Sequence, residues 1–472
     1  MSQKLAPLRP WLTAAALAAT VACVPPPTPV ETFGAGNREA ALKAQQEAVR
    51  EAHPRDRAVE QLRLGSMAYA LGDADRAEAA WRKAVGAMTN FEADGEFAAV
   101  LAAEDRKEWK GEPYEKMAAF VSLGALLHAE GDYGNALAMY KSAVLADTGS
   151  SAERFRSDFV VAFALQALAY AADRDPAQAR EAMQRAIDAK TSRHTLDVLT
   201  DALKAARDKR VPVDEVQVAK AVLLEALPGG VSAKPRDPQE AARATISWAN
   251  DLLRQQEKLP RKERLGVFVS FRGGDFDKAA RALPRVAEAF TRAVRNNDKA
   301  TEAYGEQLQR QLDRILDSPP PVVLLVEQGR GPRKIRTGEH GEVLTIVPSR
   351  SPASTPYVEV TDAPMQAVQA VALDLLSDVA YAAGNDNLGL VGDLLSLGAL
   401  LSSVLTNATA DIRQWDLAPE RWVLVTVHAP PGSHEITVDS RRYTVDVPER
   451  GQIFHLIPAL PPGGPSALGR TK

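Results

Sequence analysis

Residues 120–143 read Phe-Val-Ser-Leu-Gly-Ala-Leu-Leu-His-Ala-Glu-Gly-Asp-Tyr-Gly-Asn-Ala-Leu-Ala-Met-Tyr-Lys-Ser-Ala, and this stretch decides the predicted fold. Two runs with helical spacing flank Gly131-Asp132-Tyr133, where the glycine permits a turn conformation that a side chain resists. Gly124 and Ala136 are small, so the two helices can approach closely where they cross. Tyr140 is expected to fill the gap toward the next hairpin. The stretch therefore predicts two antiparallel helices joined by a tight turn.

The same register occurs at three further places along the chain. Each has small residues at the expected crossing, a turn with Gly-Asp or Asp, and in most cases a large side chain on the second helix. The first comprises Leu64-Gly65, Gly72-Asp73, Ala77, Trp81 and Ala84; the second Phe163, Ala167, Tyr170, Asp175, Ala179, Met183 and Ala186; the third Gly274-Asp275-Phe276 with Ala279. This pattern resembles the tetratricopeptide repeat, a unit of two antiparallel helices.

The spacing between these hairpins is uneven, because insertions such as residues 94–115 separate them. We therefore expect a compact helical body with embedded hairpins rather than a regular superhelix. Stacked hairpins leave a concave face that commonly binds a peptide or a partner helix. The alternative is that the hairpins only pack against one another.

The character of the chain changes at Pro319-Pro320-Pro321, since proline breaks a helix and favours extended geometry before it. Short apolar or alternating runs follow and predict strands. These runs are residues 322–326, 333–336, 343–347, 357–360, 422–427, 434–438, 443–447 and 453–457, with a helical block predicted over 364–405. The fold class is α+β. A helical-hairpin body over 36–318 precedes a smaller mixed domain over 319–461 with mainly antiparallel strands, and a Pro- and Gly-rich tail over 462–472 is predicted to be disordered.

The N-terminus has the organisation of a bacterial export signal. Basic residues precede the apolar run 11–19, and Thr20-Val21-Ala22-Cys23 follows with small residues at the cleavage position. The segment resembles a lipobox, with Thr20 where leucine is usual. The resemblance implies a signal peptide over 1–22, acyl chains such as palmitate on Cys23 and a membrane anchor. Cleavage of an ordinary secretory signal after Ala22 is the alternative. Prolines over 23–35 predict an extended tether.

Composition excludes several classes of protein. The 472-residue chain has a formal net charge of −4 with interspersed charges, so we expect no nucleic-acid partner. One cysteine excludes an intramolecular disulfide, and the seven histidines lack the spacing of zinc ligands, so we expect no metal or cofactor. The apolar run 394–405 is about half the length of a membrane span and is interpreted as a buried helix. The sequence contains no nucleophile elbow and no phosphate-binding loop.

Five residues are candidates for contact with a partner protein. Arg413 and Trp415 lie two positions apart, and both residue types are enriched at binding hot spots. The favoured alternative is an internal ion pair between Asp411 and Arg413, with Trp415 closing the helical part onto the sheet. The other candidates are tyrosines of the best-preserved hairpin and its entry: Tyr114, Tyr133 and Tyr140.

Several stretches carry a further resemblance: residues 109–115, 326–334, 410–415, 417–419 and 430–434. Together with the lipobox they make the chain similar to a family of bacterial tetratricopeptide-containing lipoproteins of unassigned biochemical function. The resemblance implies a role in cell-envelope assembly, in association with peptidoglycan synthesis, and Val24 after the cysteine implies the outer membrane, facing the periplasm.

The function predicted is a non-enzymatic scaffold that binds a periplasmic or envelope protein. The alternative is a cell-wall hydrolase with a site in the C-terminal domain, for which Asp411, Arg413, His428 and a glutamate would have to converge in an open cleft.

Overall fold

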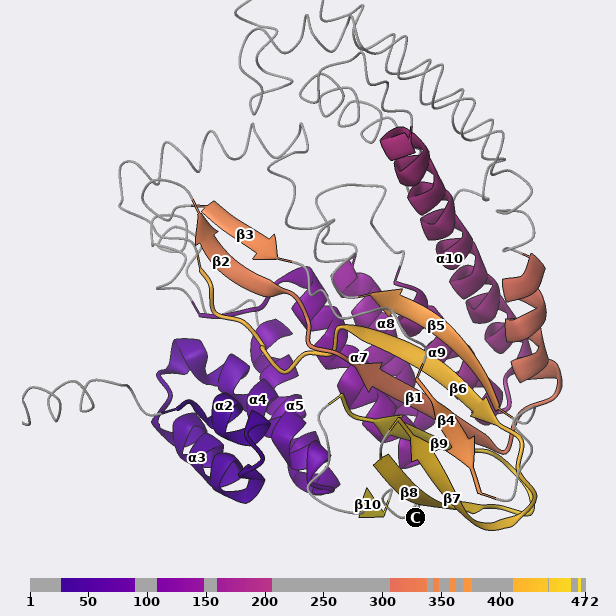
Figure 1. Cartoon of the computed structure of the whole chain (residues 1–472), viewed down its shortest axis with the longest axis horizontal. Coiled ribbons are helices and arrows are strands. Elements are labelled where there is room, and N and C mark those ends of the chain that lie inside the picture. The colour runs from indigo at the N-terminus through magenta and orange to yellow at the C-terminus, as the bar shows by residue number, and fades with distance from the viewer. Residues whose placement is uncertain are drawn as a thin grey trace, which may run out of the picture.

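The computed structural model describes residues 27–89, 108–147, 159–205, 306–337, 343–347, 356–361, 368–375, 411–439, 441–459 and 466–467. Cys23 and the lipobox, the hairpin predicted at Gly274, and the apolar run 394–405 lie outside these residues. Helices precede strands along the chain, as the α+β prediction required (Figure 1).

The helical part consists of short antiparallel pairs. Its helices are α2 (Pro29–Gly34), α3 (Arg38–Glu51), the 3-10 turn η1 (Pro54–Asp56), α4 (Arg57–Ala70), α5 (Ala74–Thr89), α7 (Pro113–Ala129), α8 (Tyr133–Asp147), α9 (Val160–Ala172) and α10 (Pro176–Ala205), and residues 306–317 are also helical. The pairs α4–α5, α7–α8 and α9–α10 correspond to three of the four hairpins predicted from the sequence.

The turns of these three hairpins share one hydrogen-bonding scheme. In each turn an aspartate opens the second helix, and its carboxylate accepts the backbone N–H three residues later: Asp73 from Arg76, Asp132 from Asn135, and Asp175 from Gln178. The residue before the aspartate has a left-handed conformation. It is Gly72 (φ 82°), Gly131 (φ 80°) or, in the third hairpin, Arg174 (φ 65°). A non-glycine residue is sterically strained in this conformation, so the third turn is the strained one of the three.

The small glycines lie where helices cross, as predicted. A Cβ built on Gly65 would lie 2.4 Å from the Trp81 ring, and one built on Gly124 would lie 2.6 Å from Cε1 of Tyr140. Tyr140 therefore packs against Gly124 within its own hairpin. The sequence-based expectation places the Tyr140 side chain in the gap toward the next hairpin, whereas its ring packs on the first helix of the same hairpin.

Three local predictions are wrong. Residues 466–467, in the tail predicted to be disordered, form a short strand that pairs in parallel with the strand at 441–447. Residues 29–34 of the predicted extended tether form α2, because Pro29 occupies the first helical turn, where its missing N–H costs nothing, and Thr28 with Glu31 forms a capping box. Residues 368–375, predicted within a helical block, form strand β5, because the stretch pairs with the strand at 421–427 at the edge of a sheet.

The strands form two four-stranded sheets and a hairpin. The inner sheet has the order β5 (Val368–Leu375), β6 (Arg421–Val427), β1 (Val322–Gln328), β9 (Ile453–Ile457). The outer sheet has the order β10 (Ser466–Ala467), β8 (Arg441–Val447), β7 (Gly432–Val438), β4 (Val358–Val360), and β2 (Arg333–Thr337) pairs with β3 (Val343–Val347). Pairing is antiparallel except for β1–β9 and β10–β8, in agreement with the prediction of mainly antiparallel strands.

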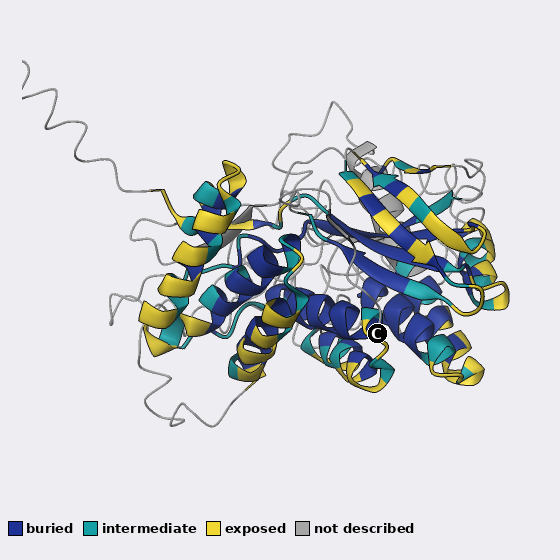
Figure 2. Ribbon diagram, turned by 90° about the horizontal axis from the view of Figure 1, so that it is seen from below, coloured by how far each residue is buried: buried dark blue, intermediate teal, exposed yellow. Residues whose placement is uncertain are grey.

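The inner sheet is the middle of three layers. Side chains alternate between the faces of a strand, and Val323 and Leu325 of β1 join the core of the helical part, whereas Val322, Leu324 and Val326 join the core shared with the outer sheet. Figure 2 shows the resulting order: helices, fully buried strands, then strands that alternate between buried and exposed. The change from helix to strand near residue 318 is therefore no boundary between separate cores.

Candidate functional site

Residues from three of the stretches singled out in the sequence, 109–115, 326–334 and 410–415, come together at one junction. Residues 411–418 have no regular secondary structure and run between the helical part and strand β2; we call them the strap. Nε1 of Trp109 donates to the backbone oxygen of Arg413 at 3.0 Å, and the backbone N–H of Lys334 donates to the Gln414 side-chain oxygen at 2.6 Å. Helical part, strap and hairpin are thus joined by polar contacts at this junction.

A buried ion pair lies at the centre of the junction. Nζ of Lys334 is 2.6 Å from a carboxylate oxygen of Glu115, and their side chains are 2% and 1% exposed. Glu115 also accepts the backbone N–H of Trp415 at 2.8 Å and that of Glu112 at 2.9 Å. The Lys334 ammonium lies 5.9 Å from the ring centroids of both Trp109 and Tyr114. Removing either side chain of such a buried pair leaves the other charge uncompensated and strongly destabilises the folded protein.

Electrostatics keep the lysine of this pair charged. Burial by itself would lower the pKa of the Lys334 ammonium, but the Glu115 and Glu112 carboxylates outweigh burial and raise that pKa. A lysine that stays protonated and has no open access is suited to holding segments together. It is poorly suited to nucleophilic chemistry, which requires an accessible neutral amine.

Arg413 fastens the other end of the strap. Its guanidinium binds Asp411 at 2.7 Å and Asp56 at 2.8 Å, and donates to the backbone oxygen of Arg55 at 3.2 Å. The side chain is 18% exposed. The internal Asp411–Arg413 ion pair favoured from the sequence is present, and the second aspartate extends it to the helical part.

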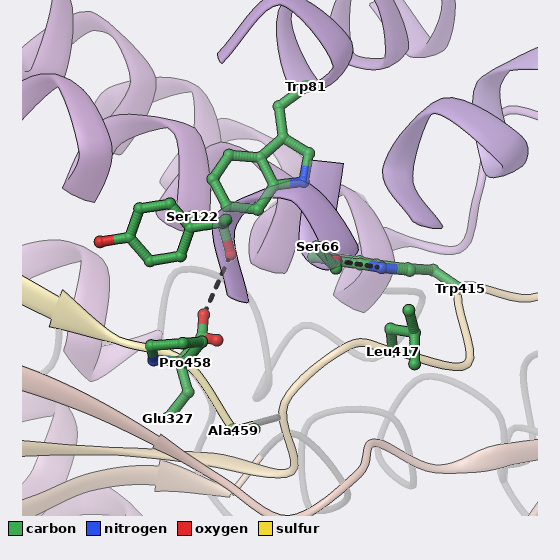
Figure 3. Close-up of a pocket in the computed structure, with 9 residues that line it drawn as sticks. Ser66, Trp81, Ser122, Glu327, Trp415, Leu417, Pro458 and Ala459 are labelled. Atoms are coloured by element: carbon green, nitrogen blue, oxygen red, sulfur yellow. Dashed lines mark hydrogen bonds between the residues drawn. The ribbon is translucent and has the colours of Figure 1, made fainter. Parts of the chain in front are cut away.

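Trp415 closes the strap onto the helices. Its residue is 3% exposed, and Nε1 donates to Oγ of Ser66 at 3.1 Å. Beside it lies a cavity of about 10 Å³, room for about one water molecule. Figure 3 shows that Ser66 and Trp415 line one side of the cavity and that Ser122 and Glu327 line another.

Glu327 is a buried carboxyl group that faces the helices from strand β1. It continues the row of Val323 and Leu325, so its side chain enters the helical core. Ser122 of α7 donates to it at 3.2 Å. Burial raises the pKa of Glu327 to about 7, and hydrogen bonds from Ser122 and the backbone of Ala459 partly oppose the rise. This group titrates near neutral pH inside the interface between helices and sheet.

The remaining candidate residues divide by burial. Tyr114 and Tyr140 are 2% and 0% exposed and belong to the core, as does Trp415. We therefore assign these three no direct contact with a partner. Tyr133 is half-buried, with its ring edge-on to His128 at 5.4 Å. His428 is exposed after strand β6, whereas Asp411 and Arg413 are held in the strap, and no described contact joins His428 to either of them.

The faces expected to bind a partner are largely occupied by the chain itself. Residues 117–128 of α7 and 160–169 of α9 are all buried, because the inner sheet covers these first helices of their hairpins. The open surface of the hairpins lies on their second helices.

A groove of about 310 Å³ opens between α8 and α10, across α9. Phe163, Gln166 and Ala182 form its buried floor, and charged residues such as Lys141 and Arg185 lie at its rim. It is at the small end of the range of ligand pockets.

Sequence reasoning missed Lys334 and Glu327, and a signal for one of them was present. Glu327 ends the apolar run 322–326, and a carboxyl group at an inward position of a buried strand is unusual. Lys334 has no such signal, since a lysine in a short strand usually faces solvent.

Comparisons with known proteins identify no relative: no family model, no curated protein and no solved structure matches this chain. Among the described residues, every helix falls short of the length and apolar character that a membrane span requires. The described residues also contain no group of three or more His, Cys, Asp or Glu side chains placed to hold a metal ion.

Proposed function

We propose that the protein is a non-enzymatic, lipid-anchored scaffold of the bacterial cell envelope, tethered to the outer membrane through Cys23. In this proposal the helical hairpins bind a periplasmic or envelope protein. The anchor rests on the lipobox-like sequence, and the envelope role rests on the resemblance described above.

The observation that carries the binding role is the groove between α8 and α10. The inner sheet already covers α7 and α9, and the strap residues Arg413 and Trp415 are engaged internally. The groove is an open surface of about 310 Å³ with an apolar floor and a charged rim, the composition expected of a site for a short protein segment. The second helices α8 and α10 thus supply the walls of the docking surface, and α9 supplies most of its floor.

Photo-crosslinking in intact cells tests this role. Gln178 is exposed at the rim of the groove, so a photoreactive residue at this position should crosslink a discrete envelope protein. The same residue placed at exposed Lys83, on the second helix of the first hairpin, is the control. Equal crosslinking from both positions, or none from Gln178, would refute the binding role.

The anchor has a separate test. Replacement of the only cysteine, Cys23→Ser, should abolish incorporation of labelled palmitate and move the protein from the membrane fraction to the soluble fraction. Unchanged fractionation would leave the scaffold without its proposed tether.

A further inference from the structure

Among the described residues, one positive charge at the rim of the α8–α10 groove has no ion-pair partner. Arg185 and Glu181 pair with each other at 2.7 Å along α10. Lys141 of α8 forms no ion pair with any described residue; its ammonium lies 5.4 Å from the ring centroid of Tyr170. Two basic side chains and one acidic side chain therefore leave a net charge of +1 on the groove.

The floor of the groove offers an unused acceptor. Gln166 is 6% exposed and its Nε2 donates weakly to the backbone oxygen of Tyr140, at 3.4 Å. Among the residues that the structure describes, its amide oxygen accepts no hydrogen bond. A buried amide with a spare acceptor is suited to a backbone N–H of a bound segment.

Apolar surface surrounds these polar groups. Phe163 and Ala182 are 4% and 5% exposed at the floor, and Val144 lies one turn along α8 from Lys141. Leu145, four positions after Lys141 on α8, is 70% exposed. The groove has room for a short extended segment rather than for a whole helix, whose diameter is about 10–12 Å.

We propose that this groove binds an acidic-apolar peptide segment of a partner protein. A Glu or Asp carboxylate of that segment pairs with Lys141, an adjacent apolar side chain packs on Phe163 and Ala182, and a backbone N–H donates to Gln166. Charge complementarity selects the acidic residue, because the Tyr170 ring holds the ammonium in place by a cation–π contact and the one carboxylate that lines the groove, that of Glu181, is paired with Arg185. The inference rests on the proposed scaffold function and specifies the chemistry of its ligand.

Fluorescence anisotropy with labelled, end-capped pentapeptides tests the charge preference on the whole protein. The probes are Ser-Leu-Glu-Leu-Ser and its versions with Gln or Lys at the centre. The Glu peptide should bind best and the Lys peptide worst, and added salt should reduce the difference between them.

Two variants assign the preference to named residues. Lys141→Met should weaken the Glu peptide about three- to fivefold, the effect of one exposed ion pair, and leave the Gln peptide unchanged. Lys83→Met, at an exposed lysine outside the groove, is the matched control. Gln166→Met should weaken all three peptides alike, because it removes a contact to the backbone, and a melting curve shows whether this buried variant is folded.

Two results would overturn the inference: no binding of the Glu peptide, or equal binding of the three peptides in the wild type and in Lys141→Met. Crosslinking from Gln178 in cells separates this failure from that of the scaffold function. If the peptides fail to bind but Gln178 still crosslinks a partner in cells, the groove binds a partner of different chemistry. If Gln178 crosslinks nothing either, the docking role fails as well.

Discussion

Glu327→Gln is the substitution with the clearest expected consequence. The Glu327 carboxyl group lies between Ser122 of α7, the phenol of Tyr69 from α4, and the backbone of Ala459. Burial raises its pKa from 4.5 to about 7. Glutamine has nearly the same shape and cannot ionise, so it isolates the free energy of the charge.

The sign and size follow from the two pKa values. Below pH 4.5 the group is protonated in both the folded and the unfolded chain and has no effect. Between pH 4.5 and about 7 the folded protein keeps a proton that the unfolded chain has released, so this group lowers the free energy of unfolding as pH rises. Each pH unit in this window is worth about 1.4 kcal/mol, and the full cost above pH 7 is about 3 kcal/mol.

Urea unfolding of both proteins between pH 4.5 and 8 measures this effect. The free energy of unfolding of Glu327→Gln minus that of the wild type should increase by about 3 kcal/mol across the range, since other titrating groups cancel in the difference. Glu449→Gln, at an exposed position between β8 and β9, is the control and should follow the wild type. A difference for Glu327→Gln that does not change with pH would show that the carboxyl group is not desolvated as described.

Four other substitutions test a helix crossing, a turn and the buried ion pair. Gly124→Ala should lower the free energy of unfolding by about 1–3 kcal/mol, since its Cβ would meet Tyr140 at 2.6 Å. Gly134→Ala has open space around its Cβ and should raise that free energy by up to about 1 kcal/mol. Thermal melting in which both variants shift in the same direction would contradict the helix crossing. Arg174→Gly should raise the free energy of unfolding by about 1 kcal/mol, because φ is 65° there, and an unchanged urea midpoint would contradict this turn geometry. Lys334→Met should cost about 3–5 kcal/mol by leaving a buried carboxylate without its counter-charge, and a variant as stable as the wild type would show that the ion pair contributes nothing.

The hairpins were predictable because their determinants are local. Gly72 and Gly131 precede an aspartate, and both residue types act within a few positions of themselves: one through its backbone conformation, the other through a cap. The strands of the inner and outer sheets were predictable for the same reason, from runs of β-branched residues. The exceptions are β5, which contains alanine and glutamine and is defined by its pairing with β6, and the two-residue β10, which is defined by its pairing with β8.

What the sequence could not predict is how the two parts meet. The contact of Glu115 with Lys334 joins residues 219 positions apart, and that of Trp415 with Ser66 joins residues 349 positions apart. Nothing in the local pattern of either partner indicates the other. A weaker signal was available in α7 and α9, which are apolar on every side; a helix of that kind must be covered all round.

The two-sided burial of β1 and β6 has a consequence for how the polypeptide matures. The hairpin helices are synthesised first, yet α7 and α9 acquire their cover only when residues 322–457 have been made. Until then the hydrophobic surface of α7 and α9 stays exposed to solvent, and exposed surface of this kind favours aggregation and chaperone binding. Residues 27–205 made alone should therefore be insoluble, and the helical part should become stable only after the strands of the inner sheet have been made.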